Sequence, residues 1–415
     1  MMLKTTRALA AGLSFAALLA SCANDKETNE IITEEQLAAP AEASAIKGQY
    51  IVVYKEDVAK QAIGETSDYG KAQEAMKAMT KRMFQESGVK DAEVISTFSK
   101  TIKGAAIKLS ADQVSRLQGR GDVDYIEEDK IVIFAPPCGT PNGVPCSEDP
   151  GDGDGGGSSS QETPYGIARV NGVSSYSGSA VAWVIDTGID LDHEDLYVDS
   201  SRGFNAFTSG KDGKSLDDGN GHGTHVAGTI GALNNNVGVI GVAPGATVIP
   251  VKVLDSRGSG SYSGVIAGVD FVAANGSNGD VANMSLGGPI SQALDDAVLA
   301  ASQQGIKFVL AAGNESDDAN SHSPARVNGS NIYTISAMDS YDSWAYFSNY
   351  GNPPVDYVAP GVGIKSTWKS GGYNTISGTS MASPHAAGIL LLGNPSTDGT
   401  VSGDPDGTSD AIIVH

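Results

Sequence analysis

From Pro164 onward, short apolar runs alternate with helical stretches, and this alternation constrains the fold more than any other feature of the chain. Strands that alternate with helices imply crossover connections and a parallel sheet covered by helices on both faces. We therefore expect an α/β fold for this part. The predicted strands are 181–185, 248–253, 281–286, 307–311 and 332–337, and the predicted helices are 266–274 and 293–304.

Three segments carry polar side chains at the end of a predicted strand, between glycines and at the start of a helix. Asp186 closes the first predicted strand, and functional residues of parallel sheets gather at the carboxyl ends of strands. His222 lies between glycines in GNGHGTH (219–225), which leave room for a substrate backbone, and Ser380 lies where a loop becomes a helix in GTSMASPH (378–385). A serine needs a base to become nucleophilic, and the base needs an acceptor that orients its ring. These residues provide the hydroxyl, the base and the acceptor.

In the order Asp, His, Ser, these segments resemble the signature blocks of the subtilase family of serine peptidases. The resemblance implies that Ser380 attacks a carbonyl, His222 takes and returns its proton, and Asp186 holds the imidazole. The string AAGN (311–314) matches the family segment whose asparagine, here Asn314, stabilises the oxyanion together with the backbone N–H of Ser380. His225 is expected to pack or to hydrogen-bond within its helix.

The resemblance also implies two extended edges that flank a substrate peptide. Their backbone groups would pair with the substrate as with an added strand, and such recognition tolerates many sequences. A plain core position is the alternative for the Leu286 side chain. The residues of the two edges are Gly258, Ser259 and Gly260, and Ser285, Leu286 and Gly287.

A structural calcium site is a further expectation from the resemblance. The segment LNNNVGV (233–239) is similar to the family's calcium loop, Asp195 stands at the position of its carboxylate ligand, and Gln161 at that of its amino-terminal glutamine. All are hard oxygen donors, as calcium requires. An Asn-rich turn without metal is the alternative. The expected ligands are Gln161, Asp195, Leu233, Asn235, Val237 and Val239.

The segment 47–134 reads as a separate small domain. Strand-like runs and two helical patterns follow one another in the order β, α, β, β, α, β, which is that of a split βαβ sandwich. Placed ahead of a subtilase-like region, it resembles the inhibitory propeptide of that family, which implies a zymogen that processes itself. An unrelated small binding domain is the alternative. The catalytic domain is assigned to 161–415.

The amino terminus has the form of an export signal. Basic residues and an apolar run in 1–22 end in LASC, which resembles the lipobox of bacterial lipoproteins with Cys22 as the acylated residue. An ordinary signal peptide is the alternative. Residues 23–46 are polar and would form a tether, so we expect an exported protein of the cell envelope, or an extracellular one after processing.

The remaining cysteines, Cys138 and Cys146, form an even pair that we expect to be a small disulfide in an exported protein. Both lie in 135–160, a linker rich in Pro, Gly and Ser where we expect cleavage. The cut should fall at or before residue 160, because Gln161 must remain with the catalytic domain to reach the calcium site. The aspartates of this linker do not have the spacing of an EF-hand calcium loop.

The net charge of −22 argues against nucleic-acid binding. A monomer is expected.

Other chemistries fit the motifs less well. His222 and His225 lack the glutamate of the zinc-peptidase motif, and the glycines near Ser259 lack the lysine of a phosphate loop. A catalytically silent peptide-binding lipoprotein on the same scaffold is the second hypothesis.

The carboxy-terminal tail departs from the family pattern, because Asn394-Pro395 interrupts the expected last helix and 395–410 is rich in Gly, Asp, Ser and Thr.

Overall fold

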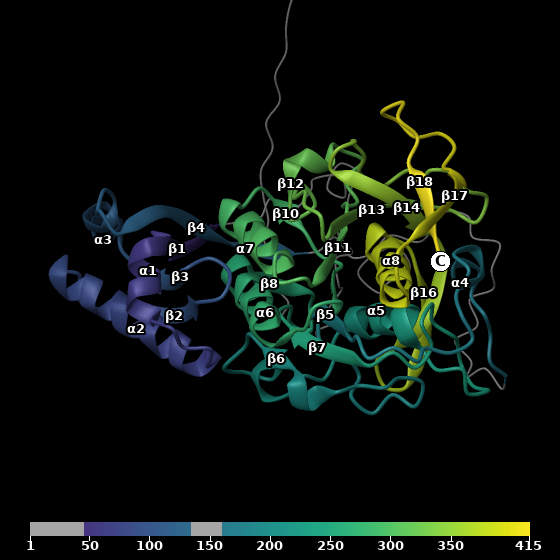
Figure 1. The fold of residues 1–415 in the computed structure, drawn as a ribbon, viewed down its shortest axis with the longest axis horizontal. Coiled ribbons are helices and arrows are strands. Elements are labelled where there is room, and N and C mark those ends of the chain that lie inside the picture. The colour runs from purple at the N-terminus through teal and green to yellow at the C-terminus, as the bar shows by residue number, and fades with distance from the viewer. Residues whose placement is uncertain (1–44, 134–159) are drawn as a thin grey trace, which may run out of the picture. The chain divides into compact units, whose positions relative to one another are not determined.

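The computed structural model describes residues 45–133 and 160–415 (Figure 1). Residues 45–133 form an antiparallel sheet in the order β2-β3-β1-β4, with helices between the strands. This arrangement confirms the predicted small α+β domain and adds the unpredicted α1. Its elements are β1 (Ala45–Tyr54), α1 (Glu56–Ile63), α2 (Tyr69–Glu86), β2 (Glu93–Phe98), β3 (Gly104–Lys108), α3 (Ala111–Leu117) and β4 (Val123–Ile133).

Local sequence explains the two predicted helices of this domain. Met76, Met79 and Met83 of α2 are buried on one face, as their spacing predicts. Ser110 and Gln113 form a reciprocal capping box that starts α3. β1 begins at Ala45, so the last two residues of the predicted tether belong to the sheet.

Residues 160–415 surround a nine-stranded sheet in the order β17-β18-β14-β13-β11-β9-β5-β7-β6. From β18 to β6 all neighbours are parallel, which confirms the predicted fold class. The strands are β5 (Ala182–Asp186), β6 (Phe204–Asn205), β7 (Val248–Lys252), β9 (Val281–Met284), β11 (Lys307–Ala311), β13 (Ile332–Met338), β14 (Val355–Pro360), β17 (Ser396–Thr400) and β18 (Ala411–Val414).

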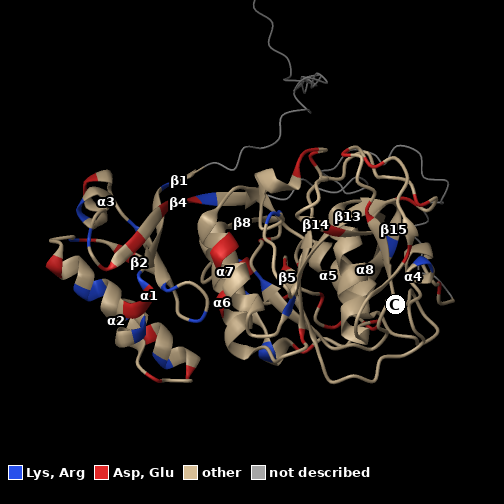
Figure 2. Cartoon of the chain, turned by 45° about the horizontal axis from the view of Figure 1, so that its top comes forward, with Lys and Arg blue, Asp and Glu red and all other residues tan. Residues whose placement is uncertain are grey.

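Helices cover both faces of this sheet. Trp183 and Ile185 of β5 pack into one core cluster with α6 and α7, whereas Ala182 and Val184 pack into another with α5 and α8. In Figure 2, α5 and α8 carry no charged residue, in contrast to the mixed charges of α2. The helices are α4 (Tyr165–Arg169), α5 (His222–Gly231), α6 (Tyr262–Asn275), α7 (Gln292–Ser302) and α8 (Thr379–Leu392).

Short strands complete the domain. β15 (Ile364–Trp368) and β16 (Gly372–Ile376) form a hairpin, and β10 (Gly288–Pro289) pairs with β12 (His322–Ser323). β8 (Ser259–Ser261) joins the sheet of the amino-terminal domain. Within residues 45–133 and 160–415, none of the helices combines the length and apolar character needed to cross a membrane.

The carboxy-terminal tail, in which the expected long helix is interrupted, is ordered as strands. α8 ends at Leu392, and β18 then pairs with β14 at the edge of the main sheet, where Ile412 and Val414 are buried with Val358. β17 is antiparallel to β18 and all of its residues are exposed. Apolar surface at the sheet edge is thus covered by a strand in place of a helical extension.

Candidate active site

Asp186 and His222 are in direct contact. The His222 Nδ1 atom lies 2.8 Å from Oδ1 and 3.0 Å from Oδ2 of Asp186, and both side chains are buried. The Asp186 carbonyl accepts hydrogen bonds from the N–H groups of Val253 and Leu254, which hold the end of β5 beside β7. A carboxylate at this nitrogen selects the tautomer that leaves Nε2 as the base.

The glycines around His222 are required by the protein itself. A Cβ on Gly221, where φ is +114°, would lie 2.4 Å from the Trp368 ring, and one on Gly223 would lie 2.1 Å from the Gly188 carbonyl oxygen. Other parts of the chain fill the space that a side chain would need at these two positions, and the expected room for a substrate backbone stays a prediction. The close approach lets α5 begin at His222 directly against the Asp186 loop.

Ser380 is the second residue of α8, which packs against α5 (Figure 1). Its Oγ donates to the Ser285 carbonyl at 3.2 Å, and the Ser285 hydroxyl donates in turn to the Ser380 carbonyl at 2.8 Å. Asp186 ends β5, and Ser285 and Asn314 follow β9 and β11. These three strands are neighbours in the sheet. The candidate residues therefore gather at one carboxyl edge.

Asn314 is oriented by Thr379. The Asn314 Oδ1 atom accepts from the Thr379 N–H at 2.8 Å and from the Thr379 hydroxyl at 3.0 Å. Because the amide oxygen is occupied in this way, the Nδ2 group of Asn314 points away from Thr379 and is the side available to donate. Thr379 was missed as a positioning residue, although its place beside Ser380 was the available signal.

The His225 side chain is buried and hydrogen-bonded in the core. Its Nε2 donates to the carbonyl of Ile364 at 2.9 Å, a partner outside its own helix, and burial lowers its pKa to about 3. A neutral, hydrogen-bonded histidine in the core packs and does not react. Among the residues that the structure describes, no group of three or more His, Cys, Asp or Glu side chains is placed to hold a metal ion.

The amino-terminal domain occupies one of the two predicted substrate edges. Residues 131–133 of β4 pair antiparallel with 259–261 of β8, with Val132 opposite Gly260. Gly258 precedes this strand in a turn, where its N–H donates to Asp255. An added strand already lies where substrate pairing was expected for Ser259 and Gly260. At the other edge, Leu286 is 3% exposed, so its side chain belongs to the core.

Carboxylates of the amino-terminal domain meet the first turns of two helices. The Asp129 Oδ1 atom accepts from the Ser263 N–H of α6 at 3.1 Å, and the Glu127 Oε2 atom accepts from the Ala293 N–H of α7 at 3.0 Å. The first N–H groups of a helix lack partners within it and favour negative charge. Burial raises the pKa of Asp129 above its usual range.

Asp270 makes the reverse contact, from the catalytic domain to the amino-terminal one. This fully buried carboxylate of α6 accepts from the backbone N–H groups of 99–101 at 2.7–3.1 Å, from the Thr101 hydroxyl at 2.9 Å and from Gln73 Nε2 at 2.9 Å. Sequence reasoning missed this residue. A single charged residue in an otherwise uncharged helix was the available signal.

The predicted calcium ligands lie together. Gln161 Nε2 is 2.6 Å from the Leu233 carbonyl oxygen and 3.1 Å from that of Val239. Asn235 Nδ2 donates to Asp195 Oδ1 at 3.0 Å, and the Val237 N–H donates to Asn235 Oδ1 at 3.0 Å. Burial raises the pKa of Asp195 to about 6.

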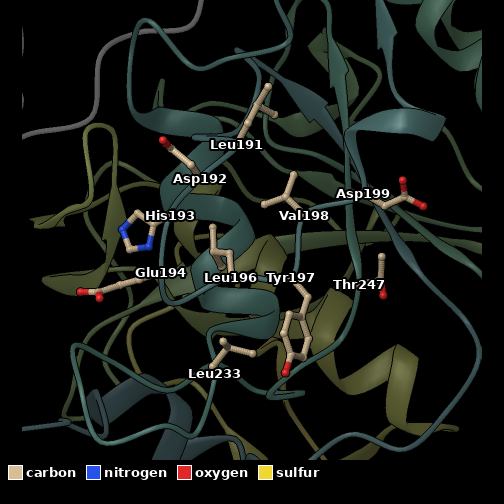
Figure 3. A pocket seen from close by; sticks show the side chains of 10 residues that line it. All are labelled: Leu191, Asp192, His193, Glu194, Leu196, Tyr197, Val198, Asp199, Leu233 and Thr247. Atoms are coloured by element: carbon tan, nitrogen blue, oxygen red, sulfur yellow. The ribbon is translucent and has the colours of Figure 1, made fainter.

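A surface pocket lies beside this loop (Figure 3). None of the four predicted catalytic residues is among those that line it, so it is separate from the site built on Asp186. Its lining residues are Leu191, Asp192, His193, Glu194, Leu196, Tyr197, Val198, Asp199, Leu233 and Thr247.

The fold and the site define a serine peptidase with an attached inhibitory domain, and comparisons with known proteins agree. Residues 177–398 match the model of the subtilase family, and residues 49–135 match that of the peptidase inhibitor I9 family. The chain therefore belongs to the subtilase family, and its amino-terminal domain is an I9 propeptide.

Individual relatives are also peptidases. The chain is 40% identical over 358 residues to the alkaline serine exoprotease A of Vibrio alginolyticus, covering 84% of this chain and 60% of that protein. It is 38% identical to the extracellular serine proteinase of a Thermus strain, covering 84% of this chain and 80% of the relative. A crystal structure of a cold-adapted subtilisin-like serine proteinase matches 60% of this chain and 97% of its own, with a TM-score of 0.53 and 40% identity.

Proposed function

We propose that this protein is an endopeptidase in which Asp186, His222 and Ser380 form the catalytic triad. The observation that carries the proposal is the buried contact between His222 Nδ1 and the Asp186 carboxylate, on a subtilase scaffold that places Ser380 on the adjoining helix. Covalent labelling of Ser380 by a fluorophosphonate tests it.

The reaction follows from these positions. Ser380 Oγ attacks the substrate carbonyl while its proton passes to His222 Nε2, and Asp186 stabilises the imidazolium that forms. The oxyanion accepts hydrogen bonds from Asn314 Nδ2 and from the Ser380 N–H. His222 then protonates the leaving amine as the C–N bond breaks. A water attacks the acyl carbonyl while giving a proton to His222, and His222 returns that proton to Ser380 Oγ as the C–Oγ bond breaks.

Substrate binding uses the two predicted edges. In the zymogen, residues 131–133 pair with 259–261 as an antiparallel strand, which supports backbone pairing of a substrate with the same edge. The Ser285 carbonyl, which accepts from Ser380 Oγ, belongs to the opposite edge with Leu286 and Gly287. Pairing through backbone atoms would tolerate many substrate sequences.

A structural calcium ion at the 233–239 loop is a second proposal. The donors present are one carboxylate, two amide side chains and backbone carbonyls, all of the hard oxygen type. The Gln161 amide nitrogen lies between two carbonyl oxygens, and a half-turn of the amide replaces it with Oε1 at nearly the same place. The residues therefore fit a cation held by Gln161, Asp195, Leu233, Asn235, Val237 and Val239.

Chelation of calcium is expected to lower the melting temperature of the processed protein. A ligand present at 100 times its dissociation constant stabilises the folded state by about 2.7 kcal/mol, a loss of several degrees on removal. Differential scanning calorimetry with and without chelator measures this, and Asp195→Ala should weaken the dependence. Asp199→Asn, a change of a nearby half-buried carboxylate that is not a predicted ligand, is the control. Identical melting temperatures in calcium and in chelator would contradict the proposed calcium site.

Export and lipid anchoring at Cys22 form a third proposal. The LASC string supports it, and one relative is named an extracellular proteinase. Cys22, Cys138, Cys146 and most of the predicted tether and linker lie outside the described residues. Mass spectrometry of the protein before self-cleavage is expected to show an acylated Cys22, and Cys22→Ser should release the protein from membranes. An unmodified amino terminus after an ordinary signal cut would contradict the anchor.

A further inference from the structure

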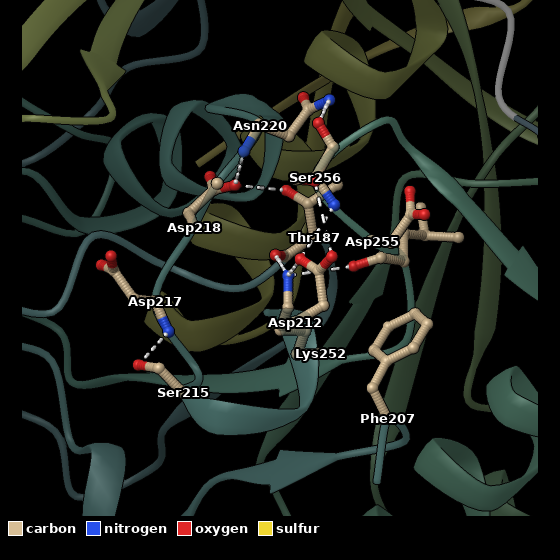
Figure 4. Close-up of polar contacts among 12 residues, drawn as sticks. Thr187, Phe207, Asp212, Ser215, Asp217, Asp218, Asn220, Lys252, Asp255 and Ser256 are labelled. Carbon is tan, nitrogen blue, oxygen red and sulfur yellow. Dashed lines mark hydrogen bonds and ion pairs between the residues drawn. The ribbon is translucent and has the colours of Figure 1, made fainter. Parts of the chain in front are cut away.

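Asp218 is a buried carboxylate that the proposed reaction does not use (Figure 4). It is 3% exposed and accepts five hydrogen bonds. Oδ1 accepts from the Thr187 hydroxyl at 2.9 Å, the Asn220 N–H at 2.9 Å and the Gly221 N–H at 2.8 Å. Oδ2 accepts from the N–H and the hydroxyl of Thr224 at 2.9 and 2.7 Å. Asp218 therefore holds the loop before His222 and the first turn of α5.

Thr187 joins this loop to the other half of the catalytic pair. It follows Asp186 directly, and its N–H donates to Asp186 Oδ1 at 2.7 Å. Its hydroxyl donates to Asp218 and accepts from the Gly223 N–H at 2.9 Å. One side chain thus bridges the segments that carry Asp186 and His222.

Lys252 contacts the backbone of Thr187. Its fully buried ammonium group donates to the carbonyl oxygens of Thr187 and, at 3.2 Å, of Leu254 (Figure 4). It lies 3.4 Å from Asp212 Oδ1, which balances its charge. Both the hydroxyl and the carbonyl of Thr187 are therefore restrained by a buried charged residue.

We infer that Asp218 and Thr187 are positioning residues that set the contact between Asp186 and His222. The inference rests on the proposed triad and deepens it. Hydrogen bonds to an ionised acceptor are short and strong, so the Asp218 carboxylate fixes both segments more rigidly than neutral groups would. The contact of His222 Nδ1 with both Asp186 oxygens depends on the placement of two backbones that are 36 residues apart. Errors of about 1 Å in such a placement cost up to about 10²-fold in rate.

Thr187→Val tests the bridge, because valine keeps the shape of threonine and replaces its hydroxyl with a methyl group that cannot hydrogen-bond. The full chain is produced, and the first-order rate of self-cleavage, kcat and KM of the processed enzyme and the melting temperature are measured. We expect self-cleavage and kcat to fall about tenfold with KM within twofold. Thr187→Ser, which retains the hydroxyl, should return both rates to within about twofold of the original chain.

The pH profile separates positioning from simple structural support. A weaker contact with Asp186 stabilises the imidazolium less, so the acid limb of kcat/KM should move to lower pH in Thr187→Val. If Thr187 served only folding, Thr187→Val would lower the melting temperature but leave kcat and the acid limb of the kcat/KM pH profile unchanged in the folded enzyme. That outcome would overturn the inference.

Asp218→Asn provides a second test with a matched neighbour. Asparagine keeps one acceptor oxygen but replaces the other with an N–H₂ group, which faces hydrogen-bond donors and cannot accept from them. We therefore expect at least a tenfold loss in the rate of self-cleavage. Asp217→Asn changes an exposed carboxylate whose Oδ1 accepts from the Leu191 N–H at 3.4 Å, and should behave as the original chain. Equal rates in the two variants would contradict the positioning role. If the original chain itself neither cleaves nor labels, the proposed function fails instead.

Discussion

Ser380→Ala is expected to abolish self-cleavage of the full chain and its labelling by a fluorophosphonate. Alanine removes the only side-chain atom that the proposed mechanism uses as nucleophile, whereas His222, Asp186 and the oxyanion donors remain. The expected loss in kcat is about 10⁶-fold, the size measured for removal of the serine in a subtilisin. Gel analysis of the unprocessed chain and in-gel fluorescence of the label measure both effects.

Ser383→Ala is the matched control for this variant. Ser383 lies one turn further along the same helix, is buried, and its hydroxyl is 2.9 Å from that of Ser285. This variant should cleave itself and label at Ser380. Labelling that persists in Ser380→Ala would contradict the assignment, and an original chain that folds but never labels would favour the silent peptide-binding alternative.

Asp270→Ala is expected to release the propeptide faster after cleavage. The change leaves the backbone N–H groups of 99–101, the Thr101 hydroxyl and Gln73 without their shared acceptor in a buried interface. Removing one partner of such a charged, hydrogen-bonded set costs about 3 kcal/mol, or roughly 10²-fold in affinity. The measurement is the lag between self-cleavage and full activity, which should shorten.

Asp296→Asn gives the comparison for Asp270. Asp296 lies on α7 and accepts one hydrogen bond, from the Tyr125 hydroxyl at 2.7 Å, so its loss should change the lag far less. An unchanged lag in Asp270→Ala would show that the propeptide is held mainly by its apolar contacts and by the β4–β8 pairing. The melting temperature of the processed enzyme should be the same in both variants.

The core elements could be predicted because burial imposes a pattern on the sequence. β11 has the predicted bounds, β5 is shifted by one residue, and β7, β9 and β13 differ from prediction by one or two residues at one end. A strand buried on both faces is a continuous apolar run, so its position is visible in the sequence. The helical patterns of α2 and α3 were equally visible, because helix periodicity and capping of α3 by Ser110 are local.

Elements whose partners are distant in the chain could not be predicted in this way. β18 is stabilised by pairing with β14. The Gly-, Asp- and Ser-rich sequence before it has no strand-like pattern, so the strand was not predicted. Asp218 and Asp270 look like ordinary polar residues in the sequence, and their roles depend on donors that other segments supply. Capping of α6 and α7 by Asp129 and Glu127 depends equally on the docking of a separate domain.

The sequence by itself determined the class of this protein, since periodic apolar runs specify the sheet and a few short segments carry the reactive groups in order. Only the tertiary structure decided which carboxylates act together. A hydrogen bond requires atoms within about 3 Å, and residues 36 or 171 positions apart reach that distance only when the sheet and helices bring them there.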